Sequence, residues 1–95
     1  MGYSLDGKKV LVTGGSSGIG AALAEGFAEH GATVGICARR ADRLGEVLDR
    51  CRKHAPESRS WVVDLSVLDG IDAFAREAEQ ELGGIDVLVN NAGIP

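Results

Sequence analysis

The sequence predicts an α/β fold with a doubly wound parallel sheet, on two observations. Short apolar runs rich in β-branched residues alternate along the 95 residues with longer segments of helical apolar spacing. Alternating strands and helices of these lengths form βαβ units, and right-handed crossovers place the helices on both faces of a parallel sheet. The expected strands and helices correspond to the first βαβαβαβ portion of such a fold, within one domain over residues 1–95.

Four short apolar runs, each bounded by turn residues, are predicted to be strands. They span residues 9–13, 33–38, 59–63 and 87–90. The first run ends at Gly14 and Gly15, and its shortness and β-branching are typical of a buried strand. The third run contains Trp61.

Three segments between these runs are predicted to be helices. The first covers residues 18–30 and stops at a glycine; its apolar face comprises Ile19, Leu23 and Phe27, with Ala24 and Ala28 beside them. The second runs from about residue 41 to 54, with helically spaced Leu44, Val47, Leu48 and Cys51. The third opens at Ser66-x-x-Asp69, which resembles a capping box, and ends before Gly83; its apolar face comprises Ile71, Phe74, Ala75, Ala78 and Leu82.

Composition narrows the classes of partner. Hydrophobic residues make up 44% and charged residues 25%, which is ordinary for a globular protein. Ten basic residues against fourteen acidic ones give a net charge of −4, which argues against nucleic acid as a partner. Because no apolar run could span a bilayer and the N-terminus has neither a signal core nor a myristoylation pattern, we expect a cytoplasmic protein without a membrane partner.

The two cysteines do not suggest a cross-link. Cys37 and Cys51 are expected to be reduced thiols that pack as small hydrophobic groups. A disulfide or a metal pair is the alternative, but no further ligands accompany them, and we predict no metal site. His30 and His54, each alone near a helix end, are expected to be solvated or capping groups.

The first candidate site is the glycine-rich segment Thr13–Gly20, between the first strand and the first helix. Glycine gives a tight turn its backbone freedom and lets a pyrophosphate approach the main chain without an intervening Cβ. The helix N-terminus offers unpaired N–H groups and a positive dipole end to an anion. Gly14, Gly18 and Gly20 give the spacing G-x-x-x-G-x-G, which is neither G-x-G-x-x-G nor a P-loop.

The second candidate site is Asn90–Gly93, at the end of the fourth strand. Strands one and four are neighbours in a doubly wound sheet, and ligands bind in the crevice at their carboxyl ends. Side-chain amides there can fix loop backbone, and the small Ala92 and Gly93 leave room for a ribose. In isolation the tetrapeptide would indicate only a turn, so its weight comes from its pairing with the glycine-rich segment.

Together these motifs resemble the short-chain dehydrogenase/reductase family. The resemblance is carried by Thr-Gly-x-x-x-Gly-Ile-Gly from Thr13, by Asn-Asn-Ala-Gly from Asn90, by the Gly84–Val89 segment before it, and by Asp64 with Leu65. It covers essentially the whole chain and implies the N-terminal part of a Rossmann-type NAD(P)-binding domain. It also implies a parent oxidoreductase that transfers a hydride between NADPH and a carbonyl or alcohol substrate, as a homo-oligomer.

The resemblance further implies roles for the matching positions. The pyrophosphate would lie against Gly14, Gly18, Ile19 and Gly20. Thr13 would tie the two motif loops together. Asp64 would hydrogen-bond the adenine amino group, with Leu65 beside the ring. The adenosine and nicotinamide riboses would be lined by Asn91, Ala92 and Gly93.

Charge at the end of the second strand bears on the choice of cofactor. An acidic residue there would accept the ribose 2′-hydroxyl of NAD and repel a 2′-phosphate, but this chain has Ala38 followed by Arg39 and Arg40. A guanidinium can hold a 2′-phosphate through forked, charge-assisted hydrogen bonds. Ser16 and Ser17 would add hydroxyl donors, although many NADP-using relatives carry a basic residue in this loop. NADP(H) is therefore favoured over NAD(H), and the alternative is that both arginines are simply solvated.

The catalytic part implied by the resemblance lies outside this sequence. The family's acid/base pair is Tyr-x-x-x-Lys, and Tyr3 precedes the first strand with glycine at position 7. We therefore assign no catalytic residue and expect the 95-residue chain alone to be inactive. The alternative function is a non-catalytic nucleotide-binding or cofactor-sensing module, and a methyltransferase-like fold is disfavoured by the glycine pattern.

Overall fold

The computed structural model of the chain describes residues 4–14, 18–64 and 71–90. Within these ranges four strands alternate with three helices, as the sequence predicts. The elements are β1 (Lys9–Thr13), α1 (Gly18–Glu29), β2 (Thr33–Ala38), α2 (Ala41–Arg52), β3 (Arg59–Val62), α3 (Ile71–Leu82) and β4 (Val87–Asn90).

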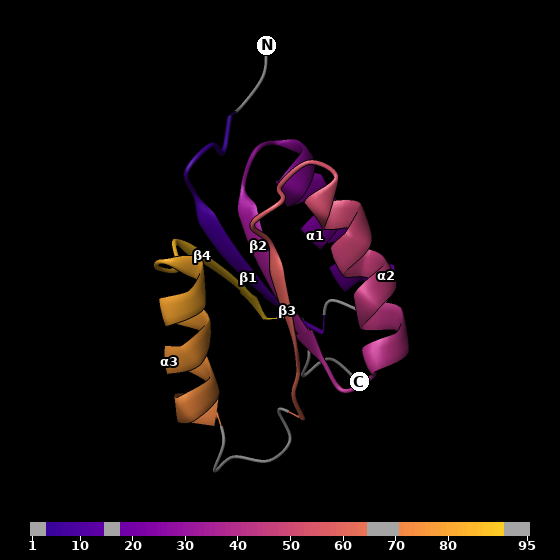
Figure 1. Ribbon diagram of the computed structural model, residues 1–95, viewed down its shortest axis with the longest axis vertical. Helices are drawn as coiled ribbons and strands as arrows, with labels where there is room; N and C mark the ends of the chain where they lie inside the picture. Colours follow the sequence, from indigo (N-terminus) through magenta and orange to yellow (C-terminus); the bar gives the residue numbers. More distant parts are fainter. Residues whose placement is uncertain (1–3, 15–17, 65–70, 91–95) are drawn as a thin grey trace.

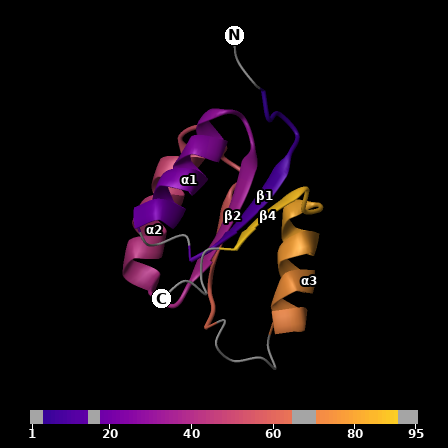
Figure 2. The same cartoon turned by 180° about the vertical axis from the view of Figure 1, so that it is seen from behind.

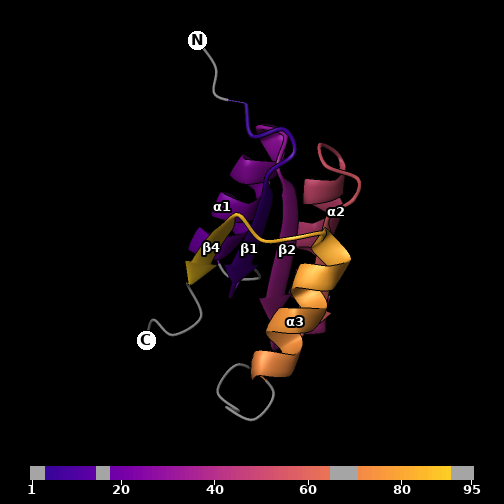
Figure 3. The same ribbon diagram turned by 90° about the vertical axis from the view of Figure 1, so that its left-hand side faces the viewer.

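The strands form a single parallel sheet in the order β3-β2-β1-β4. Figure 3 views the molecule from the side of α3. In this view the strands β4, β1 and β2 lie side by side and point the same way. β1 lies between β2 and β4, and the register aligns Thr13 with Cys37 on one side and with Asn90 on the other. This order confirms the predicted Rossmann-type, doubly wound fold.

Three layers make up the molecule. α1 and α2 cover one face of the sheet, and α3 covers the other face (Figure 1). The view from behind shows the same separation, with the sheet between the helix pair and the single helix (Figure 2). This placement follows from right-handed crossovers between parallel strands.

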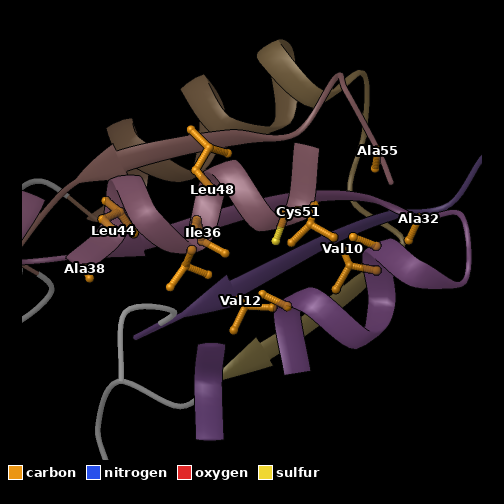
Figure 4. Close-up of a cluster of buried hydrophobic side chains, with 13 residues drawn as sticks. Val10, Val12, Ala32, Ile36, Ala38, Leu44, Leu48, Cys51 and Ala55 are labelled. Atoms are coloured by element: carbon orange, nitrogen blue, oxygen red, sulfur yellow. The ribbon is translucent and has the colours of Figure 1, made fainter. Parts of the chain in front are cut away.

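The larger of two core clusters lies between the sheet and the α1–α2 pair (Figure 4). Alternate residues of β1 and β2 enter it, among them Val10, Val12 and Ile36, all with 1% or less of their surface exposed. From α2 it receives Leu44, Val47, Leu48 and Cys51, the four residues predicted from helical spacing.

The face that α1 buries differs from the face that its large apolar residues suggest. The buried residues of α1 are Gly20, Ala24 and Ala28, whereas Ile19 is 72% exposed and Leu23 is 39% exposed. Small side chains let the helix backbone approach its neighbours closely, so the small residues form the packed face. Phe27 on the expected face is only half-buried, and the expectation that Ile19 and Leu23 form the packed face is therefore wrong.

The smaller core cluster lies between the sheet and α3. It consists of Leu11, Cys37, Phe74 and Ala78, with Trp61 packed against it. The Trp61 and Phe74 rings meet edge to face at 5.6 Å, and Trp61 Nε1 donates to Glu81 Oε2 at 2.9 Å.

Ala75 on α3 is exposed rather than part of the expected apolar face. Leu82 is buried as expected, and α3 ends before Gly83 and Gly84, which have φ values of +83° and +128°. The Ser66-x-x-Asp69 capping box lies outside the described residues. The other boundaries are close: α1 and α2 end at Glu29 and Arg52, slightly earlier than predicted.

The third strand also ends one residue early, at Val62, although Val63 N–H still donates to Ala38 O at 2.9 Å. Before the strand begins, the buried Ser58 hydroxyl accepts the Val34 N–H at 3.0 Å. The side chain thereby supplies the β2 backbone with an acceptor where β3 has not yet started.

Both cysteines are free and buried, as predicted. A ring nitrogen of His30, Nδ1, lies 2.9 Å from Gly26 O, and His30 and His54 are both exposed. Among the described strands β4 lies at one edge of the sheet: Val87 is 41% and Leu88 61% exposed, while Val89 packs partly against the larger core cluster.

Candidate functional site

The carboxyl ends of three neighbouring strands meet at one edge of the sheet. After β1 the chain adds β2 and then β3 on one side of β1, whereas β4 lies on its other side. The strand order therefore reverses direction at β1. In open α/β sheets ligands bind outside the carboxyl ends of the strands at such a reversal. The residues that follow β1, β2 and β4 are those that the sequence predicts to bind a nucleotide.

Gly14 is the first residue beyond β1 and has a φ of +72°. Its N–H donates to Cys37 O at 2.8 Å, which continues the β1–β2 ladder by one residue. A side chain at this φ would be strained, so glycine suits the position. The turn leads to the N-terminus of α1, a helix of 12 residues with no acidic residue in its first turn, and such a terminus attracts an anion.

The three candidate residues at the start of α1 have different surroundings. Gly18 and Ile19 are exposed, and Gly20 is buried against the core. A ligand at this helix end would therefore meet the backbone of Gly18 and the uncovered side chain of Ile19. Ser16 and Ser17, predicted as hydroxyl donors, lie outside the described residues.

Thr13 connects the ends of β1 and β4. Its side chain is 8% exposed, and its hydroxyl lies 3.3 Å from Val89 O and 3.2 Å from Asn90 Oδ1. A hydroxyl has one proton to donate but can also accept, so an Asn90 amide turned with its nitrogen toward Thr13 would satisfy both contacts. The two strand ends that precede the predicted motif loops are thus joined by side chains.

The two arginines follow β2 at the same edge. Arg39 and Arg40 are exposed, and Arg40 Nε lies 3.9 Å from Asp42 Oδ1 in an exposed ion pair. Such surface pairs are weak, typically worth less than about 1 kcal/mol. The end of β2 therefore carries two positive side chains that a phosphate in solution can reach.

The remaining predicted residues belong to the ends of β3 and β4. Asp64 comes two residues after β3 ends and is exposed. Leu65, Asn91, Ala92 and Gly93 lie outside the described residues.

The thiol nearest this edge is unsuited to nucleophilic chemistry. Cys37 is fully buried on β2 beside Gly14. Burial raises the pKa of its thiol to about 11, although a backbone hydrogen bond from Gly14 opposes this rise. The thiol is therefore protonated at neutral pH, and the thiolate is the reactive form.

Two polar residues, one at each end of β4, were given no individual role by the sequence analysis. Asn90 contacts Thr13, and Asp86 bonds twice to the Lys9 backbone just before β4. The signal in the sequence that could have pointed to Asp86 is a carboxylate directly before an apolar strand. Among the described residues no three His, Cys, Asp or Glu side chains gather as a metal site would require, and no helix is long and apolar enough to cross a membrane.

Comparisons with known proteins agree with this geometry. Residues 8–95 match the short chain dehydrogenase family. Over 89 residues the chain is 47% identical to a fatty acyl-CoA reductase of Mycobacterium tuberculosis, and over 91 residues it is 46% identical to an 11-beta-hydroxysteroid dehydrogenase-like protein of Arabidopsis thaliana. These matches cover 94% and 95% of this chain but only 30% of each relative's length.

Solved structures give the same result. L-sorbose reductase from Gluconobacter frateurii, crystallised with NADPH and L-sorbose, superposes with a TM-score of 0.86 at 40% identity, covering 99% of this chain and 36% of that one. A short-chain type dehydrogenase/reductase from Mycobacterium marinum superposes with a TM-score of 0.87 at 38% identity, covering 96% and 37%. The chain belongs to the short chain dehydrogenase family.

Proposed function

We propose that this chain is the NADP(H)-binding portion of an oxidoreductase that transfers a hydride between NADPH and a carbonyl or alcohol substrate. One observation carries the cofactor choice: the end of β2 has Ala38 where an NAD-binding site would place an acid, and it presents the following Arg39 and Arg40 to solvent. The relative L-sorbose reductase was crystallised with NADPH, which supports the same choice.

The strand order suggests how the dinucleotide lies. Moving along the carboxyl edge from β2 through β1 to β4, it passes the two arginines, then Gly14 with the start of α1, then Asn90. A 2′-phosphate, a pyrophosphate and a nicotinamide ribose fall in the same sequence along the cofactor. The positive φ of Gly14 suits the central pyrophosphate, and so does the N-terminus of α1, whose first turn has no acidic residue.

The other proposed contacts follow the family. Asp64 would bond the adenine amino group and Leu65 would lie beside the ring. Ser16 and Ser17 would donate to phosphate. Around the riboses we place Asn91, Ala92 and Gly93. The bound cofactor would supply the hydride to a carbonyl or accept it from an alcohol, while this chain's residues would bind and orient the cofactor.

A binding experiment tests the cofactor choice. We expect the protein expressed from its complete reading frame to bind NADPH more tightly than NADH, and Arg39→Ala to remove most of the difference. Loss of a hydrogen bond to a charged group costs about 1.5–3 kcal/mol, or roughly tenfold to a hundredfold in affinity. Calorimetric titration measures both ligands, and Arg50→Ala in the last turn of α2 is the control for loss of one positive charge.

Arg50→Ala should leave the NADPH/NADH ratio unchanged. Equal affinities of the unmodified protein for the two cofactors would contradict the proposal. Turnover separates an enzyme from a cofactor-sensing module: the enzyme oxidises NADPH with some member of a carbonyl panel, whereas a sensor binds NADPH without oxidising it. The cytoplasmic location and the homo-oligomeric state expected from the sequence stay predictions.

A further inference from the structure

The two arginines that follow β2 differ in their surroundings. Arg40 Nε lies 3.9 Å from Asp42 Oδ1, whereas Arg39 makes no ion pair with any residue that the structure describes. Arg39, Arg40 and Asp42 are all exposed. A phosphate that reaches this edge of the sheet therefore meets one unpaired guanidinium and one whose charge is partly balanced by a carboxylate.

The ion pair spans the start of α2. Arg40 is the residue just before the helix, with an extended backbone (φ −107°, ψ 114°) and no side-chain hydrogen bond that caps the helix. Asp42 is the acidic residue in the first turn of α2. A helix N-terminus favours a negative side chain, so this position suits the Asp42 carboxylate whether or not Arg40 is beside it. We expect the carboxylate to remain next to the proposed 2′-phosphate position.

The pair is weak enough for a phosphate to compete with it. A contact of 3.9 Å is too long for a hydrogen bond, so the two side chains are attracted by charge alone. They are 67% and 72% exposed, and water and salt screen the attraction. A 2′-phosphate that drew Arg40 toward itself would have to separate it from Asp42 and would bring further negative charge toward the carboxylate. Asp42 therefore opposes the contribution of Arg40, and Arg39 has no such competitor.

We propose that Asp42 is a specificity-determining residue that acts through Arg40 and limits the preference for NADPH over NADH. The proposal rests on the proposed function. It requires that Arg39 supply most of the preference in the unmodified protein, and that Arg40 contribute fully only when the charge of Asp42 is removed. NADH has no 2′-phosphate, so its affinity should not depend on Asp42.

The test measures NADPH and NADH affinities by calorimetric titration, on the protein expressed from its complete reading frame. Asp42→Asn removes the charge and keeps the shape of the side chain. It should strengthen NADPH binding about twofold to fivefold, the range of an exposed ion pair, and change NADH binding less than about 1.5-fold. Asp42→Glu keeps the charge and should behave like the unmodified protein. Because exposed charges are screened, the gain in Asp42→Asn should shrink at about 0.5 M salt.

A double-mutant cycle tests whether the effect passes through Arg40. Arg40→Ala should weaken NADPH binding less in the unmodified protein than in the Asp42→Asn protein, because only the latter has an unpaired Arg40. Asp49→Asn is the matched control, since Asp49 is also exposed and lies about two turns further along α2. It should leave the ratio of the two affinities unchanged.

The outcomes separate this proposal from the proposed function. An unchanged or smaller NADPH preference in Asp42→Asn would overturn the inference alone, and so would an equal gain when residue 40 is already alanine. Asp42→Ser also removes the charge and should give the same gain; a gain in only one of the two variants would mean that shape matters instead, and would contradict the inference. Equal affinities of the unmodified protein for NADPH and NADH would overturn both proposals.

Discussion

Gly35 in the centre of β2 is a position at which one added methyl group should be clearly felt. A Cβ built on Gly35 would lie 2.8 Å from Trp61 Cζ3, 2.9 Å from Leu82 Cδ1 and 3.2 Å from Leu11 Cδ1. Carbon atoms pack favourably at about 3.5–4.0 Å, so all three neighbours must move in Gly35→Ala.

The neighbours differ in how easily they can move. The two leucine methyl groups can shift by small rotations. The Trp61 ring cannot do so freely, because it is bonded to Glu81 and packed edge to face on Phe74. Overpacking of this kind costs about 1–3 kcal/mol, and replacing glycine returns about 0.4–1 kcal/mol through the unfolded chain. We expect Gly35→Ala to lower the free energy of unfolding by about 1–2 kcal/mol.

Urea unfolding followed by far-ultraviolet circular dichroism measures the effect, at a protein concentration where the chain does not associate. With a slope of about 1–3 kcal/mol per molar urea, the midpoint should fall by roughly 0.3–2 M. Gly45→Ala is the matched control, because Gly45 is exposed on α2 and a Cβ there would meet nothing within 4 Å. That variant should gain about 0.5–1 kcal/mol, since alanine is the better helix former.

A Gly35→Ala protein as stable as the unmodified one, with Gly45→Ala stabilised as expected, would refute this reasoning. It would mean that the β2–α3 contact has room that the packing around Trp61 does not indicate.

The remaining predictions concern pH and association. Burial raises the pKa of both Cys37 and Cys51 from 9.0 to about 11, the Glu25 charge adding to the effect at Cys51. As pH rises, the thiols of the unfolded chain therefore ionise before those of the folded chain. The contribution of the protonated thiols to the free energy of unfolding is fully present below about pH 9 and is lost between pH 9 and 11, by roughly 1.4 kcal/mol per thiol at pH 10. Urea unfolding at pH 8 and pH 10 checks this, and a Cys37→Ala, Cys51→Ala double variant that loses as much stability as the unmodified chain would count against it. The 95-residue chain alone should self-associate through its β4 edge, and Leu88→Lys should reduce this in light scattering after gel filtration; a monodisperse unmodified chain with a sharp high-temperature melt would contradict it.

The order and bounds of the elements could be predicted because the apolar period changes cleanly between strand and helix. The packed face of α1 could not, because Ile19, Leu23 and Phe27 give the stronger apolar signal although Gly20, Ala24 and Ala28 are the residues that let the backbone approach. Periodicity ranks residues by hydrophobicity, whereas close packing here selects for small size.

For the candidate site, the places of Gly14 just after β1 and of the two arginines just after β2 could be predicted from the sequence, and their contacts to a ligand stay predictions. The Asp86 contact to Lys9 could not, because it joins residues 77 positions apart and depends on the exact register of two strands. No local pattern encodes such a register, and only the assembled sheet reveals it.

The two buried cysteines lie in clusters on opposite faces of the sheet, so each thiol can report on the opening of one face. Cys37 packs in the cluster beneath α3, and Cys51 packs in the cluster beneath α1 and α2. A thiol reagent can reach either sulfur only when the corresponding layer opens, so the labelling rate at each cysteine reports the free energy of that opening. Single-cysteine variants would therefore reveal whether the helices leave the sheet together or whether one face opens while the other stays closed.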